Sequence, residues 1–502
     1  MISVFAARPF ALPGFPGAAL PQARPVRGHY PRSTAGMASA FRPRRLAAIL
    51  AVALWLPLTV GCQTITFGEK QEAPATPAPS ETPEEEEAAS ADAPKETRII
   101  VPSAVLDEDP FLLDDVAGAR DKPGAQIALL VPLSGQHAAV GQALLEGAQM
   151  ALFDMRNPAA NLIPFDTHGT PDGAREAAVK AVKAGADIIL GPLLTTSVEA
   201  AAPIARRSGV NLLSFSNNPA VVGGGVYALG FSPAEQVRTI VDFAVGQGAK
   251  RFAVLAPTGP YGELVAQSMQ ATVPNYPAQI ASLRFIDQNA HDYADIITAI
   301  SNYDGRRQAL VSERKSLSGK TDEASKAALR RLEELETLGD PPFDAILLAA
   351  TSNTTLRTLA AQLAYYDVDQ PAVRVLGLQL WDEFPRLQTE PSLIGSWYPA
   401  PANERLDQFR TRFAQFYGRR PQRLASLGYD ATALCAVLAG DGEAPGYDTA
   451  TLTNEQGFLG VDGLFRLLPT GVVQRSYAIR EITPTDIETV EPARTTFTPL
   501  VN

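Results

Sequence analysis

The stretch Gln126–Ala151, QIALLVPLSGQHAAVGQALLEGAQMA, carries the clearest signal of this chain's architecture. A short apolar run ends at Pro132, a turn follows at Ser134 and Gly135, and a helix-forming segment follows the turn. Strands joined to helices by short turns of small residues are the repeating unit of parallel α/β sheets. Ligands of such sheets bind beyond the carboxyl ends of the strands. The stretch therefore predicts an α/β fold and places the Ser134 turn beside a cleft.

Composition narrows the classes of function. The chain has 502 residues, 46% of them hydrophobic, and a net charge of −11. This balance argues against nucleic acid as a partner, because phosphate binding needs clustered Lys and Arg. Only two cysteines occur, Cys62 and Cys435, and the four histidines are scattered without an HExxH motif. We therefore expect no disulfide framework, no metal and no cofactor.

An export signal is predicted near the amino terminus. Three arginines precede the apolar run Leu46–Val60, which leads into Gly61 and Cys62. This series is typical of a signal peptide. The small residues before Cys62 resemble the lipobox of bacterial lipoproteins, although Thr59 stands where that family usually has Leu. The resemblance implies that residues 37–61 are a lipoprotein signal peptide and that Cys62 is lipidated. An ordinary signal peptide and a short membrane anchor are the alternatives.

The segments around this signal are expected to lack a fold of their own. Residues 1–36 contain many Arg and Pro but no Asp or Glu. They suit either a transit peptide or an upstream extension, and the lipobox favours the extension, with Met37 as the start. Residues 62–122 are rich in Pro and contain the run Glu84–Glu87. Such composition predicts a disordered acidic tether with a span of about 40–45 Å, or a plain spacer.

Two series of alternating strands and helices follow. The first is expected to place strands at Ile127–Leu133, Leu162–Asp166, Asp187–Leu190, Asn211–Ser216 and Val226–Leu229, with helices at Ala138–Met155, Pro171–Ala184 and Thr196–Arg207. The second is expected to place strands at Arg251–Ala256, Leu283–Ile286, Ala345–Ala349 and Val373–Leu378, with helices at Gly262–Ala271, Tyr293–Asn302 and Thr354–Tyr366. Capping boxes are predicted at Thr196–Glu199 and Ser232–Glu235. The alternation predicts two Rossmann-like lobes with mostly parallel sheets.

The lobes share residues 123–490. We expect lobe 1 to hold about 123–246 and 396–450, and lobe 2 about 247–395 and 451–490, with the first crossover near Val245–Lys250. The charged segment 306–340 is expected to be a solvated helical insertion, with a docking helix as the alternative. Helices are expected at Arg405–Tyr417 and Leu427–Ala439, the second of which would bury Cys435. Gly463–Ile482 alternates like a closing hairpin.

Several short segments together resemble the type I periplasmic binding-protein fold of the leucine-binding-protein superfamily. They are LVPLSG at 130–135, GQALLEGAQMA at 141–151, GPLLTT at 191–196, LSFSNNP at 213–219, YGE at 261–263 and SLGYD at 426–430. The resemblance implies two lobes joined by three crossovers, with a cleft at the hinge. The first strand and helix, with the lipobox and the acidic tether, resemble lipid-anchored penicillin-binding-protein activators. That resemblance implies a periplasmic, outer-membrane-anchored protein that stimulates a peptidoglycan synthase.

The same resemblance implies a set of cleft residues. In amino-acid receptors, hydroxyls and backbone N–H groups at helix starts bind the ligand carboxylate, which suits the donors at a helix N-terminus. Thr195 and Thr196 match this position, although both could simply cap the helix. Ser216 and Asn217 match a second contact region, in a loop about one residue shorter. Tyr261 matches the aromatic side chain that lies on the ligand, and Ser134 is expected at the same cleft.

The partner for a ligand ammonium is missing from the expected place. There the receptors carry an acidic residue, whereas this chain has Gln379, and Thr351 and Ser352 stand where a tyrosine is common. Burying an ammonium without a partner is costly. A zwitterionic amino acid is therefore a poor fit, unless Asp382 or Glu383 replaces the missing carboxylate.

Enzyme motifs are missing from the sequence. It has no GxSxG, no P-loop and no well-placed SxxK, and Gly223–Gly225 lacks the setting of a dinucleotide site. We therefore expect a protein without catalysis. The favoured function is activation of a penicillin-binding protein, the alternative is a solute receptor of an ABC importer for amino acids or related small molecules, and an enzyme or unrelated scaffold comes last.

Overall fold

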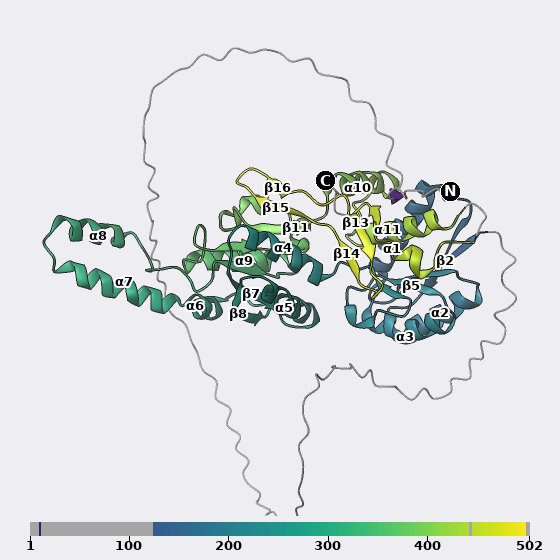
Figure 1. Ribbon diagram of the computed structural model, residues 1–502, viewed down its shortest axis with the longest axis horizontal. Helices are drawn as coiled ribbons and strands as arrows, with labels where there is room; N and C mark the ends of the chain where they lie inside the picture. Colours follow the sequence, from purple (N-terminus) through teal and green to yellow (C-terminus); the bar gives the residue numbers. More distant parts are fainter. Residues whose placement is uncertain (1–9, 12–123, 441–443, 498–502) are drawn as a thin grey trace, which may run out of the picture. The chain divides into compact units, whose positions relative to one another are not determined.

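The computed structural model describes residues 10–11, 124–440 and 444–497 (Figure 1). The predicted signal peptide, Cys62 and the acidic tether lie outside the described residues. They therefore remain predictions.

The first lobe is built on a five-stranded parallel sheet with the order β3-β2-β4-β5-β6. Its strands are β2 (Ala125–Val131), β3 (Ala160–Asp166), β4 (Ile188–Leu190), β5 (Asn211–Ser214) and β6 (Val226–Ala228). Helices α1 (Ala138–Met155) and α11 (Ala425–Leu438) pack on one face, and α2 (Pro171–Lys183) and α3 (Thr195–Arg207) on the other. Alternate residues of β2 enter the two cores, so the whole strand is buried.

The second lobe has a seven-stranded sheet with the order β16-β15-β11-β10-β9-β7-β8. Five parallel strands form most of it: β7 (Arg251–Pro257), β8 (Gln279–Ile286), β9 (Ala345–Leu348), β10 (Arg374–Leu376) and β11 (Trp397–Ala400). The antiparallel strands β15 (Ala478–Ile482) and β16 (Ile487–Glu491) complete one edge. Residues of α4 (Pro233–Gly246) and α5 (Pro260–Thr272) join the core on one face, and those of α6 (Ala294–Ser301) and α9 (Asn353–Tyr365) the core on the other.

A small antiparallel sheet, β12 (Phe458–Gly460), β13 (Gly463–Leu467) and β14 (Val473–Arg475), extends the first core. The two-residue strand β1 (Phe10–Ala11) pairs with β12. Helix α10 (Asn403–Tyr417) packs with α1 and α11, and α12 (Thr449–Leu452) precedes the small sheet. Short 3-10 helices complete the chain: η2 (Pro219–Val221), η3 (Val273–Asn275), η4 (Gln379–Glu383), η5 (Leu387–Thr389) and η6 (Pro391–Leu393). Two lobes with mostly parallel sheets and three crossovers confirm the predicted fold class.

The crossovers lie at other residues than the sequence predicts. Helix α4 packs in the second-lobe core, so the chain leaves the first lobe before Pro233 and not near Val245–Lys250. Strand β11 belongs to the second sheet, although 396–450 was expected in lobe 1. Strands β12, β13 and β14 join the first core, although 451–490 was expected in lobe 2. Hydrophobic periodicity shows that a face is buried but not against which core, and that explains the difference.

Two local predictions also need correction. Gly463–Ile482 is not one hairpin, because β15 leaves β14 and pairs with β11 of the other sheet. The two predicted capping boxes do not form. Helix α3 begins one residue early, after Leu194, and the Ser232 hydroxyl makes no cap although Pro233 does occupy the first turn of α4. Side-chain caps occur instead at Thr170, Asp322, Ser352 and Asp448.

Helices α1 and α11 cross at unusually close range. A Cβ on Gly147 would lie 1.9 Å from the Ala425 carbonyl oxygen, and one on Gly428 would lie 2.3 Å from that of Leu144. Glycine is thus required on both helices where their backbones meet. Cys435 lies further along α11 and is fully buried, as predicted, and burial raises the pKa of its thiol.

The predicted insertion forms a helical hairpin of α7 (Tyr303–Ser318) and α8 (Glu323–Glu333). Figure 1 shows it reaching away from the second sheet, beyond α6. None of the α8 residues is fully buried. This agrees with the expectation of a solvated helical insertion.

Candidate functional site

A polar loop cluster lies at the carboxyl edge of the first sheet. Asp166, at the end of β3, accepts hydrogen bonds from the backbone N–H groups of Leu133 (2.9 Å) and His168 (2.7 Å). The Ser134 hydroxyl lies 2.6 Å from His168 Nδ1, which is also 3.1 Å from Asp166 Oδ2. Partial burial raises the pKa of Asp166, but the hydrogen bonds outweigh burial and leave the pKa below its usual value. Because both contacts use Nδ1, the group lacks the relay geometry of a serine hydrolase.

A second pair of hydroxyls forms on the next strands of the same edge. Thr195 Oγ1 lies 3.2 Å from Ser216 Oγ, which also accepts the N–H of Asn218 at 3.2 Å. Thr195 is half-buried at the start of α3, whereas Thr196 is exposed. Asn217 is half-buried beside Ser216. The structure therefore brings Thr195 and Ser216 together as donors at a helix start, with Thr196 turned towards solvent.

Tyr261 and Gln379 lie beyond strands of the second sheet. Tyr261 is in the first turn of α5, after β7, and burial raises its pKa to about 12, so its hydroxyl stays neutral. Gln379 begins η4 after β10 and is 5% exposed. Its backbone N–H donates to Gln236 Oε1 (3.0 Å), while both atoms of its side-chain amide are buried without a partner in the described chain. Such an amide is suited to a neutral group or a water molecule.

The carboxylates that could replace the missing acid are already engaged. Asp382 Oδ1 lies 2.8 Å from Arg480 Nη1, and Glu383 Oε1 lies 2.9 Å from Arg410 Nη2. Arg423 Nε is a further 3.4 Å neighbour of Glu383. A ligand ammonium would have to break these ion pairs to reach either carboxylate. The option that Asp382 or Glu383 serves an amino-acid ligand is therefore poorly supported.

The ion pairs of Glu383 join the two lobes. Arg410 and Arg423 belong to the first lobe, whereas Glu383 lies in the second. Arg423 also lies 2.8 Å from Asp462 and stacks over the Phe231 ring at 4.1 Å. The sequence did not predict this network, because nothing in the spacing of these residues signals a contact. One weak indication is Asp462 in the segment GVDG, because an acid between small and apolar residues suggests a buried carboxylate that needs a partner.

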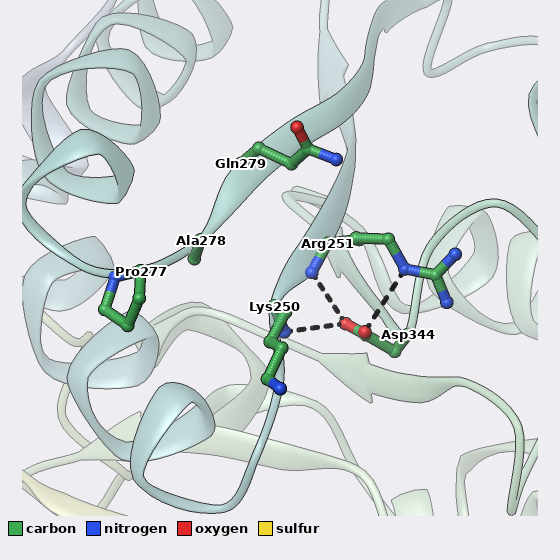
Figure 2. A pocket seen from close by; sticks show the side chains of 6 residues that line it. All are labelled: Lys250, Arg251, Pro277, Ala278, Gln279 and Asp344. Carbon is green, nitrogen blue, oxygen red and sulfur yellow. Dashed lines mark hydrogen bonds and ion pairs between the residues drawn. The ribbon is translucent and has the colours of Figure 1, made fainter.

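An open cavity of about 610 Å³ lies at the amino ends of strands in the second sheet (Figure 2). It is lined by Lys250, Arg251, Pro277, Ala278, Gln279 and Asp344. Asp344 accepts the backbone N–H groups of Lys250 (3.0 Å) and Arg251 (2.8 Å), so its carboxylate holds the amino ends of β7 and β9 together. This position is away from the carboxyl edge where ligands of such sheets bind.

Within the residues that the structure describes, no group of three His, Cys, Asp or Glu side chains could hold a metal ion. Nor does any helix there combine the length and apolar character needed to cross a membrane.

Known structures share this fold. A branched-chain amino acid ABC transporter protein of Rhodospirillum rubrum superposes with a TM-score of 0.58 at 18% identity, covering 73% of this chain and 100% of that chain. A branched chain amino acid ABC transporter ligand-binding protein of Burkholderia xenovorans gives 0.54 at 15% identity, covering 75% and 96%. At such identities the likeness concerns the fold alone.

Curated relatives match part of the chain. An uncharacterized protein of Rickettsia prowazekii is 26% identical over 184 residues, 36% of this chain and 49% of its own length. The penicillin-binding protein activator LpoA of Glaesserella parasuis is 25% identical over 180 residues, 36% of this chain and 30% of its own length. The chain thus spans less than half the length of these relatives. The sequence profile described as periplasmic binding protein matches residues 124–483. The chain therefore belongs to the periplasmic binding protein family.

Proposed function

We propose that this protein is a non-catalytic, periplasmic activator of a peptidoglycan synthase of the penicillin-binding protein class. The observation that carries the proposal is the occupied state of Asp382 and Glu383, both held by arginines. A receptor for amino acids needs a carboxylate for the ligand ammonium, since an unpaired buried ammonium is costly. The position that matches the receptors' acid holds Gln379, whose side chain carries no charge to neutralise an ammonium.

The curated relatives and the architecture also support the activator role. Two curated relatives, from Glaesserella parasuis and Pasteurella multocida, are penicillin-binding protein activators. The helical hairpin α7–α8 adds an exposed surface to the second lobe, which a receptor that encloses a small molecule does not require. Fixed ion pairs between the lobes also suit a protein that works through its outer surface.

A reconstituted assay tests the proposal. The full chain would be added to purified bifunctional synthases from the same cell, and glycan polymerisation and crosslinking would be measured. We expect a several-fold rise in at least one rate, saturating with concentration. A solute receptor of the same fold serves as the control. If no synthase from that cell responds, the activator role is refuted.

Anchoring is a separate proposal. We propose that Cys62 is lipidated and holds the protein at the outer membrane of the periplasm. Cys62→Ser should release the mature chain from the membrane fraction or leave an uncleaved precursor, while Cys435→Ser should change neither, because Cys435 is buried in α11. Unchanged fractionation and unchanged mature mass of Cys62→Ser would refute lipidation.

A second candidate function is a solute receptor of an ABC importer. The hydroxyl pair of Thr195 and Ser216, 3.2 Å apart at a helix start, favours it as a carboxylate site. Calorimetry with leucine, isoleucine and valine should show no binding in the micromolar range, because Gln379 cannot neutralise an ammonium. Saturable binding that Thr195→Val abolishes would instead support the receptor.

A further inference from the structure

The hairpin α7–α8 is fixed to the second lobe by a buried arginine at its base. Arg306 is 5% exposed, and its guanidinium donates to the carbonyls of Ser301 (3.0 Å), Tyr366 (3.0 Å) and Asp367 (3.1 Å). It also donates to the Thr337 hydroxyl at 2.9 Å, which connects the segment after α8 to the start of α7. A buried arginine whose N–H groups are mostly hydrogen-bonded fixes the positions of the groups that accept those bonds. The base of the hairpin is therefore held in a defined position on the second lobe.

The two helices are also fastened to each other. Arg314 of α7 donates to the Leu332 carbonyl (2.6 Å) and to the Leu335 carbonyl (2.9 Å), which lie at and beyond the end of α8. Leu310 and Leu317 of α7 are buried, whereas the apolar side chains of α8 are only half-buried. The outer faces of both helices are exposed to solvent.

Charge is distributed unevenly along this projection. We call residues 314–331, which flank the turn between α7 and α8, the distal segment. It contains six Lys or Arg and two Asp or Glu, in a chain of net charge −11. The two acids are engaged locally: Asp322 caps α8 through the Ser325 N–H, and Glu323 pairs with Lys326. The rest of the hairpin, 303–313 and 332–340, contains two basic and six acidic residues.

Four basic side chains of the distal segment are left for a partner. Lys315, Lys320, Arg330 and Arg331 are exposed, and none has a carboxylate within 4.0 Å among the described residues. The distal segment has no exposed large hydrophobic side chain, since those of the hairpin are Val311 and Leu335. Helices that insert into membrane surfaces present Trp, Phe or Leu. The chemistry therefore suits an acidic protein surface better than a lipid surface.

We infer that the distal segment is the docking element through which this protein meets an acidic surface of its partner protein. The inference rests on the proposed function and adds the chemistry of the contact. Exposed basic groups on a fixed projection raise the rate of encounter with an acidic patch and set its register. Such attraction weakens as salt screens it.

Binding kinetics with matched variants test the inference. The full chain would be captured on immobilised synthase at low and high salt, with the triple variant Lys315→Glu, Arg330→Glu and Arg331→Glu beside the wild type. The control triple is Lys183→Glu, Arg207→Glu and Lys250→Glu, which changes net charge equally at exposed sites elsewhere. We expect the distal triple to lower the association rate constant at low salt about tenfold and to flatten its salt dependence. The control triple should do neither.

The outcomes separate the two proposals. Wild-type binding with an unaltered association rate in the distal triple would overturn the docking inference and leave the proposed function standing. Absence of wild-type binding to any synthase would overturn both. A parallel arm uses vesicles containing phosphatidylglycerol. The inference would be overturned if the wild type binds these vesicles and the distal triple does not, while both bind the synthase equally. The distal segment would then be a lipid-binding element.

Discussion

At the scale of single residues, Gly147 shows how little space the fold leaves between α1 and α11. Its Cβ would meet the Ala425 carbonyl oxygen at 1.9 Å, and a backbone atom there cannot turn aside. Gly147→Ala should therefore destabilise the protein by about 1–3 kcal/mol, measured as a shift of the urea unfolding midpoint. Gly246→Ala is the control, because nothing lies within 4 Å of that Cβ at the end of α4. Equal midpoints for both variants would contradict the close crossing.

Asp430 gives a prediction about pH. Burial, together with the neighbouring Asp462 carboxylate, raises its pKa to about 7, against the opposing hydrogen bonds from the Val461 and Asp462 N–H groups. The folded protein thus keeps a proton that the unfolded chain loses near pH 4. The stability from this group is complete below about pH 4 and is lost as pH rises to about 7. Melting temperatures at about pH 5 and about pH 8 should differ less in Asp430→Asn than in the wild type, and an identical difference would refute this assignment.

At the scale of elements, the hairpin α7–α8 is expected to be dispensable for folding. No α8 residue is fully buried, and α8 packs on α7. Replacing residues 311–334 with a short Gly-Ser linker should change the free energy of unfolding by less than about 1 kcal/mol. Arg306→Ala is the contrasting variant, expected to cost about 2–4 kcal/mol because the Ser301, Tyr366 and Asp367 carbonyls lose their donor. If the deletion unfolds the second lobe, the hairpin is part of its core.

At the scale of the whole molecule, the ion pairs of Glu383 with Arg410 and Arg423 should restrict movement between the lobes. Glu383→Gln should broaden the distribution of inter-lobe distances, measured between spin labels on Lys183→Cys and Tyr365→Cys in a Cys62→Ser background. The buried Cys435 should not take up label. Glu390→Gln breaks an ion pair inside the second lobe, with Arg357, and should leave the distribution narrow. An unchanged distribution in Glu383→Gln would show that other contacts fix the lobes.

The sequence alone determined the order of elements and the class of fold. Residues 138–155 were expected as a helix and form one, and β2, β4, β5 and β6 lie where apolar runs predicted strands. Such local signals suffice because a strand or helix records in its own periodicity that a face is buried. The resemblance to the leucine-binding-protein superfamily, and not periodicity, proposed Thr195 and Ser216 for one cleft, and their hydroxyls do meet.

Only the tertiary structure decided which core each face joins and which charges meet. Helix α4 and strands β12, β13 and β14 have apolar faces that fit either lobe by pattern, and packing assigns them to the lobe opposite the one predicted. In the sequence nothing shows a partner for Asp382 or Glu383. In the structure Arg480 binds Asp382 and Arg410 binds Glu383, and each arginine is 27 or more residues away along the chain. Ion pairing depends on distance in space, which crossovers between lobes set and which no local pattern records.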